Sequence, residues 1–105
     1  MKMTLITPTR YLIRSTKKFN NSLKKIYKQG KDISKLEEVV EILANGEPLE
    51  IRNKNHNLIN DKNFKYCKEC HIEPDWILIY QHKDDDLILL LLDTGSHSDL
   101  FRSGR

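Results

Sequence analysis

The sequence predicts one small α+β domain, in which two helices cover one face of an antiparallel β-sheet. Three observations predict it. Hydrophobic side chains repeat every three to four residues before Gly46 and every two residues from Phe64 onward, and a chain of 105 residues suffices for one domain but not for two. We expect an ordered core over about residues 10–101 and a flexible tail at 102–105.

A short strand and two helices are expected in the first half of the chain. The strand is expected over residues 10–14, where Tyr and Ile stand between charged residues. A first helix follows between a cap at 15–16 and Gly30, and a second between a cap at 32–34 and the Asn-Gly pair at 45–46. The short connection between the helices implies an αα-hairpin. Its hydrophobic stripes are Phe19, Leu23, Ile26, Tyr27, Ile33, Leu36, Val39, Val40 and Leu43.

The second half of the chain is expected to form a three-stranded meander. Residues 47–63 are rich in Asn and interrupted by Pro48, which predicts a loop. A strand with alternating faces follows over 64–72, and two continuously apolar central strands over 76–80 and 87–92. The alternation assigns Phe64, Tyr66, Cys70 and Ile72 to one face and Lys65, Cys67, Glu69 and His71 to the other. With the N-terminal strand, these segments predict a small antiparallel sheet that carries the helix pair on one face.

The charge of the chain is unevenly distributed. Residues 1–31 contain nine Lys or Arg and no acidic residue, whereas the remaining residues contain nine basic and fifteen acidic groups, a net charge of −6. A cationic segment of this kind favours a polyanionic partner, most simply nucleic acid, although a solvated lysine-rich helix would give the same pattern.

We expect a cytoplasmic protein with free thiols. No apolar run approaches the roughly 20 residues that span a bilayer, and the first residues do not resemble a signal peptide. Two alternatives to free thiols are a zinc site and a redox pair, because the chain contains the Cys-x-x-Cys motif Cys67-Lys68-Glu69-Cys70. A zinc site usually needs a second pair of ligands, and residues three apart in a strand point to opposite faces, so we expect no metal here.

Histidines and a carboxylate occur where the predicted central strands begin and end. His71 and Asp75 flank a Pro-Asp turn, and His97 follows a Gly-Ser turn after the last central strand. If the central strands pair, all three converge on one open face of the sheet. Two histidines and a carboxylate suit RNA cleavage without a metal, in which one group takes the proton of the ribose 2′-hydroxyl and another protonates the departing 5′-oxygen. His82 is expected to be structural.

Three segments together resemble the YafQ-type toxins of the RelE/ParE superfamily. They are residues 56–58, 69–80 and 94–101, and the resemblance extends over about residues 13–101. It implies the RelE/ParE-like microbial RNase fold and a bacterial type II toxin, which is a ribosome-dependent, metal-independent endoribonuclease that cuts mRNA. It also implies an antitoxin that neutralises the toxin, and no cofactor.

The resemblance further implies a role for individual residues. His97 would act as the general acid or stabilise the transition state, Asp75 or His71 would be the general base, and His56 would contact the phosphate. Phe101 would stack on a base. The residues expected to bind substrate are Trp76, Phe101, Lys65 and Lys68.

The sequence departs from the pattern of these toxins at two arginines. Asp93 stands where an arginine is common and is expected to repel the scissile phosphate, and Lys68 replaces another arginine but keeps its charge. Two alternatives therefore remain: a ParE-like inhibitor of a topoisomerase, and a weakened toxin that acts mainly by binding its antitoxin. The basic first helix would contact either ribosomal RNA or an acidic segment of the antitoxin.

Overall fold

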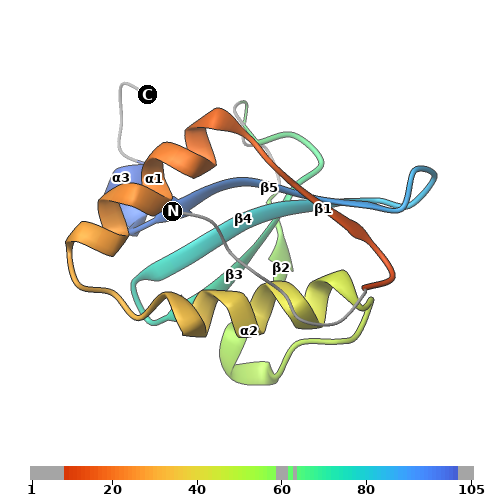
Figure 1. The fold of residues 1–105 in the computed structure, drawn as a ribbon, viewed down its shortest axis with the longest axis horizontal. Coiled ribbons are helices and arrows are strands. Elements are labelled where there is room, and N and C mark those ends of the chain that lie inside the picture. Colours follow the sequence, from red (N-terminus) through yellow and green to blue (C-terminus); the bar gives the residue numbers. More distant parts are fainter. Residues whose placement is uncertain (1–8, 59–61, 63, 102–105) are drawn as a thin grey trace.

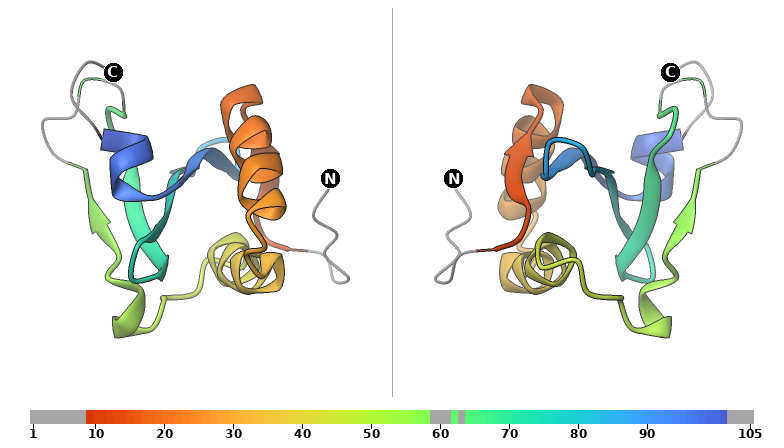
Figure 2. Two further views of the ribbon diagram at one scale, coloured as in Figure 1. Left: turned by 90° about the vertical axis from the view of Figure 1, so that its left-hand side faces the viewer. Right: turned by 90° about the vertical axis from the view of Figure 1, so that its right-hand side faces the viewer.

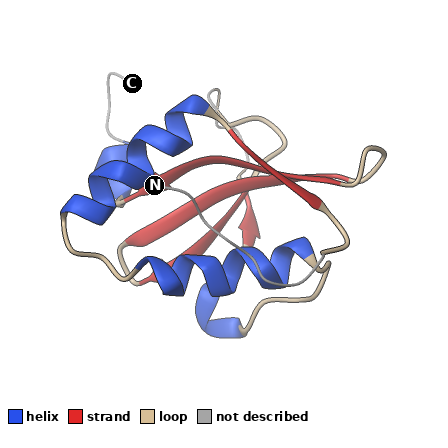
Figure 3. Cartoon of the chain, in the orientation of Figure 1, coloured by secondary structure: helices blue, strands red, loops and turns tan. Residues whose placement is uncertain are grey.

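The computed structural model describes residues 9–58, 62 and 64–101, and in these residues three α-helices and a short 3-10 helix lie around a five-stranded sheet (Figures 1 and 3). The elements are, in chain order, β1 (Leu12–Ser15), α1 (Lys17–Lys28), α2 (Ile33–Ala44), η1 (Ile51–Asn53), β2 (His56–Asn57), β3 (Lys68–Glu73), β4 (Trp76–Lys83), β5 (Ile88–Gly95) and α3 (His97–Phe101). The mixed α+β class is as predicted. The tail expected at 102–105 lies outside the described residues.

The strand order is β1-β5-β4-β3-β2, and the predicted antiparallel meander of β3, β4 and β5 is present. The first strand differs from the expectation, because β1 pairs with β5 in parallel, with Leu12 opposite Ile88. The sheet is therefore mixed and not purely antiparallel. Alternation of side chains has the same period in both kinds of pairing, so the pattern carries no information about the direction of an edge strand.

Both long helices begin at side-chain caps and end before a glycine with left-handed backbone. The Oγ1 atom of Thr16 accepts a hydrogen bond from the N–H of Phe19 at 3.0 Å, and the carboxylate of Asp32 accepts one from the N–H of Ser34 at 3.1 Å. Gly30 (φ 84°) and Gly46 (φ 72°) follow the two helices. The predicted helix boundaries are thus confirmed to within two residues.

The two helices share one hydrophobic core with one face of the sheet. Phe19, Leu23 and Ile26 of α1 and the buried side of α2 pack against this face, and the sheet contributes Cys70, Trp76, Leu78, Tyr80, Leu89 and Leu91. The expected αα-hairpin is not a close antiparallel pair. Figure 2 shows α1 upright where α2 is viewed nearly end-on, so the two helix axes are far from antiparallel.

A smaller core covers the opposite face of the sheet. Its buried members are Phe64, Cys67, Ile77, Ile79 and Leu100, so that α3 and the segment before β3 cover this side. Cys67 and Cys70 belong to different cores, are both buried and are not joined in a disulfide. The Cys-x-x-Cys motif therefore does not bring its two thiols to one side of the strand.

The segment before β3 forms a turn where a strand was predicted. The N–H of Cys67 donates to the carbonyl of Phe64 at 3.3 Å, and Tyr66 adopts left-handed backbone (φ 62°) with 87% of its surface exposed. The alternation predicted that Tyr66 and Cys70 lie on one face of a strand. In the structure Tyr66 is exposed in a turn and Cys70 is buried, so this prediction is wrong. Among the described helices, none is long and apolar enough to cross a membrane.

Candidate active site

The turn between β3 and β4 meets the start of α3. Pairing of Ile77 in β4 with Gly95 in β5 brings the end of β5 beside the start of β4. Asp75 and His97 are therefore neighbours: Oδ1 of Asp75 lies 3.1 Å from the backbone nitrogen of His97 and 3.2 Å from its Nδ1 atom. The ring of His71 has its centroid 5.5 Å from that of His97. The three residues thus lie together, as the pairing of the central strands predicted.

The contacts of Asp75 determine how the ring of His97 is presented. The backbone N–H of His97, the His97 ring and the charge of Lys31 all lower the pKa of the Asp75 carboxyl below its usual value. An ionised carboxylate accepts a hydrogen bond from the Nδ1–H group of His97, which leaves Nε2 as the atom of His97 that exchanges a proton with a ligand. The His97 side chain is 52% exposed, so a ligand in solution can reach it.

His71 is held more deeply than His97, with a side chain that is only 12% exposed. Its Nδ1 atom lies 3.1 Å from the carbonyl oxygen of Pro74, where it can donate a hydrogen bond. Its Nε2 atom lies 3.6 Å from Oε1 of Glu69. An irregularity in the pairing of β3 with β4, between His71 and Glu73, accompanies this geometry at the turn.

A buried carboxylate links His71 to the more distant His56. Glu69 is opposite His56 in the β2–β3 pair, and its Oε1 atom lies 3.3 Å from Nε2 of His56. Glu69 is not among the site residues predicted from the sequence, although the alternation places it on the same face as His71. The missing information was the position of His56, because β2 was not predicted.

Phe101 completes the site at the end of α3. Its ring centroid lies 6.1 Å from that of His97 and 6.1 Å from that of Phe64, with which it forms a T-shaped pair. The side chain is partly buried against the smaller core. The ring is therefore positioned beside the histidines, where a flat ligand could contact it.

Trp76 and His82 stabilise the fold and do not line the site. Trp76 is fully buried in the core beneath the helices, and its Nε1–H donates to Oγ1 of Thr94 at 3.0 Å. The expected contact of Trp76 with substrate is not available to this buried side chain, which belongs to the core that α1 and α2 share with the sheet. His82 Nε2 lies 2.8 Å from the carbonyl of Leu43 at the end of α2, in agreement with the structural role expected for it.

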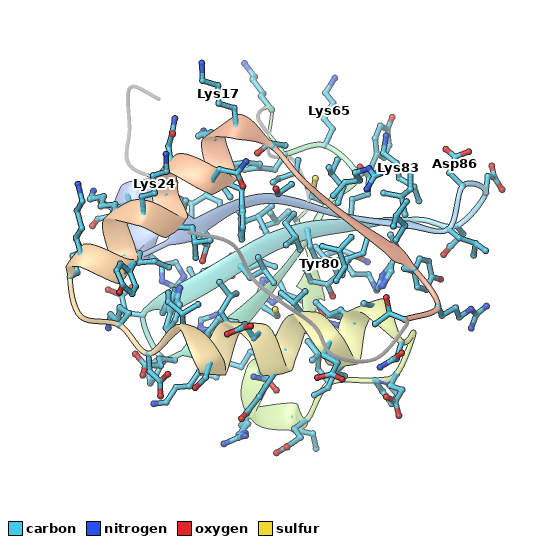
Figure 4. All side chains as sticks on the ribbon, in the orientation of Figure 1. Lys17, Lys24, Lys65, Tyr80, Lys83 and Asp86 are labelled. Atoms are coloured by element: carbon cyan, nitrogen blue, oxygen red, sulfur yellow. The ribbon has the colours of Figure 1, made fainter. Side chains whose placement is uncertain are left out.

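The two lysines expected to bind substrate differ in position. Lys68 precedes Cys70 by two residues in β3, so it lies on the helix-covered side of the sheet, away from His71. The sheet thus separates Lys68 from the histidines. Lys65 is exposed in the turn before β3, and Figure 4 shows its side chain pointing away from the body of the protein.

Two lysines hold the turn that carries Asp75. Glu73 accepts a hydrogen bond from Lys31 at 3.1 Å and another from Lys35 at 2.8 Å. The hydrogen bond from Lys35, and to a smaller extent that from Lys31, lowers the pKa of the Glu73 carboxyl. The hydrogen bond to Glu73 raises the pKa of Lys35 in turn. The turn is therefore tied to the start of α2 as well as to the sheet.

Asp93 does not occupy the position in space that its place in the sequence suggested. It is buried, and its Oδ1 atom accepts hydrogen bonds from the hydroxyl of Ser22 at 2.6 Å and from the N–H of Thr94 at 2.9 Å. Its Oδ2 atom lies 3.6 Å from Nζ of Lys18. Asp93 thus joins β5 to α1, and the expectation that it would face the phosphate is not supported by its contacts.

Three of the side chains could also hold a metal ion. One ligand atom from each of Glu69, His71 and His97 lies within 4.8 Å of the other two. Two imidazole nitrogens and a carboxylate oxygen form a donor set that suits zinc or copper. The same three residues thus offer proton-transfer chemistry and, with small rotations, metal coordination.

Comparison with known proteins places the chain in a family. Residues 11–102 match the family model described as the bacterial toxin of a type II toxin-antitoxin system, YafQ. The mRNA interferase toxin YafQ of Escherichia coli strain B / BL21-DE3 is 38% identical over 84 residues, which cover 79% of this chain and 87% of that protein. The same toxin of strain K12 is 37% identical over the same length.

Solved structures agree with this assignment. A metal-bound toxin from Helicobacter pylori has a TM-score of 0.80 and 41% identity, covering 87% of this chain and 99% of its own. The E. coli DinJ-YafQ toxin-antitoxin complex contains a chain with a TM-score of 0.78 and 33% identity, covering 88% of this chain and 98% of its own. With the family model matching most of its length, the chain belongs to the YafQ family of type II toxin-antitoxin toxins.

Proposed function

We propose that this toxin is an mRNA interferase, an endoribonuclease that cuts mRNA on the ribosome and so inhibits translation. Its relatives bear the name mRNA interferase, which supports the activity. The observation that carries the proposal is the pair of imidazoles, with centroids 5.5 Å apart, of which His97 is oriented by two contacts with Asp75. Cleavage at a ribose needs one proton acceptor and one proton donor, which two imidazoles can supply.

The proposed reaction uses the 2′-hydroxyl of the substrate as the nucleophile. His71 takes the proton of this hydroxyl at Nε2, and the 2′-oxygen attacks the adjacent phosphorus. The bond from phosphorus to the 5′-oxygen of the next nucleotide then breaks, and His97 gives a proton to that oxygen. The products are a 2′,3′-cyclic phosphate and a free 5′-hydroxyl, and no metal is required by this route.

The contacts of each group support this division of roles. The hydrogen bond to Pro74 leaves Nε2 of His71 as its proton acceptor, and Glu69 stabilises the positive charge that forms there. Asp75 is a poor general base because its pKa is lowered, so we assign it the orientation of His97. We retain a phosphate contact for His56 and stacking on a base for Phe101.

The basic surface of α1 supports binding to ribosomal RNA. Lys18 and Lys25 are within 3.6 Å of Asp93 and Asp99, whereas Lys17, Lys24 and Lys28 have no ion pair among the described residues. Figure 4 shows the side chains of Lys17 and Lys24 pointing outward. We propose that an acidic antitoxin covers part of the same surface, as the DinJ-YafQ complex of the relative suggests, and that the toxin acts in the cytoplasm.

Mapping of transcripts after induction tests the site. We expect His97→Ala to lower the cleavage rate by about 10²- to 10⁴-fold, the usual contribution of a general acid. Asp75→Asn is expected to lower it less, since the ring remains but loses its charged partner. Asp86→Asn is the matched control, because Asp86 is an exposed aspartate in the distant β4–β5 hairpin (Figure 4).

Two results would contradict the proposal. Cleavage at the wild-type rate by folded His97→Ala would remove the assigned site. Growth arrest with intact transcripts and a DNA-damage response would instead support the topoisomerase inhibitor, which does not need the histidines.

A further inference from the structure

An exposed tyrosine next to the site has no role in the fold or in the proposed reaction. Tyr66 is 87% exposed, and its backbone is left-handed, with φ of 62°. Such a backbone is unfavourable for a bulky residue, and glycine or asparagine would adopt it more readily. Because the ring is not buried, packing does not compensate for this unfavourable conformation. The choice of tyrosine therefore calls for another explanation.

The turn that carries Tyr66 borders the site on two sides. Phe64, two residues earlier, forms a T-shaped pair with Phe101 at 6.1 Å between ring centroids. On the other side, the carbonyl of Cys67 accepts a hydrogen bond from the N–H of Leu58 at 2.9 Å, two residues after His56. Figure 2 shows the segment before β3 beside α3. The turn that carries Tyr66 is thus joined to Phe101 through Phe64 and, through Leu58, to the segment that carries His56.

The surroundings of Tyr66 match single-stranded RNA. The preceding residue, Lys65, is an exposed cation that can contact a phosphate, while an aromatic ring offers a stacking platform to any base. Leu87 provides a comparison, since it also has left-handed backbone (φ 52°) and is 47% exposed, but lies in the β4–β5 hairpin. The position beside the site and the aromatic ring distinguish Tyr66 from it.

We propose that the ring of Tyr66 stacks on a base of the mRNA strand next to the nucleotide that is cleaved, with Lys65 contacting the adjoining phosphate. Tyr66 thereby extends the substrate-binding surface beyond Phe101 and contributes to the choice of cleavage position. The inference rests on the proposed mRNA cleavage. It adds a subsite that holds a base without taking part in proton transfer.

The test compares glycine substitutions at the two left-handed positions. Tyr66→Gly removes the ring and relieves the backbone, and Leu87→Gly relieves a left-handed backbone and removes an aliphatic side chain in the distant β4–β5 hairpin. Both are expected to unfold at a temperature equal to or above that of the wild type. In single-turnover cleavage of mRNA on programmed ribosomes, Tyr66→Gly is expected to lose about tenfold in efficiency, in the range of one lost stacking contact. Leu87→Gly is expected to cleave as the wild type does.

Two further variants separate the ring from the hydroxyl and from the backbone. Tyr66→Phe retains the ring and is expected to restore efficient cleavage. Tyr66→Asn tolerates the left-handed backbone without a ring and is expected to repeat the loss. A series of templates, each with one abasic nucleotide near the cleavage site, identifies the stacked base. At one position the abasic template should lower cleavage by the wild type and leave Tyr66→Gly unchanged.

Three other results would each contradict one part of the proposal. If Tyr66→Gly cleaves as efficiently as Leu87→Gly, Tyr66 does not bind substrate. If its loss persists on every abasic template, the ring contacts something other than an mRNA base. If the wild type itself leaves mRNA intact on ribosomes, the proposed function fails before Tyr66 is tested.

Discussion

The contacts of Asp93 illustrate how much of a residue's role depends on its neighbours in space. Its place before Thr94 suggested a charge facing the substrate, but the carboxylate is buried against α1 and receives hydrogen bonds from Ser22 and Thr94. The ammonium of Lys18, 3.6 Å from Oδ2, offsets part of the negative charge of this carboxylate. These contacts give Asp93 a place in the fold, and the catalytically weakened toxin stays a prediction.

Exchanging Asp93 should affect stability more than catalysis. We expect Asp93→Arg to lower the free energy of unfolding by about 3 kcal/mol or more, because it places a cation beside Lys18 and leaves the Ser22 and Thr94 donors without an acceptor. Asp93→Asn retains an oxygen acceptor and is expected to cost about 1 kcal/mol. Urea unfolding measures both. A stable Asp93→Arg variant that cleaves faster than the wild type would instead support the expectation that Asp93 repels the scissile phosphate.

At the scale of a single element, the stability of helix α3 depends on its packing against the rest of the protein. A helix of five residues is too short to be stable alone. It is held by the buried side chain of Leu100 and by the contacts of His97 with Asp75. The orientation of the His97 ring is thus coupled to a hydrophobic contact in the smaller core.

Truncation of Leu100 should separate this coupling from general stability. Leu100→Ala is expected to lower the free energy of unfolding by about 2–5 kcal/mol, the usual cost of such a cavity. Cleavage per folded molecule should fall as well, because α3 no longer holds His97 against Asp75. Leu12→Ala, at an exposed position of β1, should change both quantities little. Unchanged cleavage per folded Leu100→Ala molecule would show that α3 does not position the ring.

The whole molecule separates its charges. Figure 4 shows Lys17 and Lys24 of α1 toward one end and Lys83 and Asp86 at the other, in the β4–β5 hairpin, which carries three aspartates, Asp84, Asp85 and Asp86. An asymmetric distribution of this kind orients a protein as it approaches a polyanion. We therefore expect one preferred docking orientation on the proposed ribosomal partner.

Reversal of one charge at either end tests the orientation. Lys24→Glu is expected to weaken ribosome binding and to reduce the dependence of log Kd on log salt by about one phosphate contact. Lys83→Glu makes the same change of net charge at the far hairpin and should have a smaller effect. Binding measured over a salt series checks this. Equal losses from both variants would mean that only the net charge matters.

Local patterns predicted the elements and chemical groups that depend on nearby residues. Caps and glycines marked both long helices, and runs of apolar residues marked the central strands. The convergence of His71, Asp75 and His97 followed from the pairing of those strands. Strand β2, with two residues, is too short to leave a periodic pattern, so the contact between His56 and Glu69 could not be foreseen.

The sequence alone determined the fold class, the positions of the helices and meander, and the residues available for proton transfer, because these depend on periodicity and residue type over short stretches. Tertiary structure decided the parallel direction of β1, the burial of Trp76 and Asp93, and the exposure of Tyr66. Those properties arise from contacts between residues far apart in the chain, which no local pattern records.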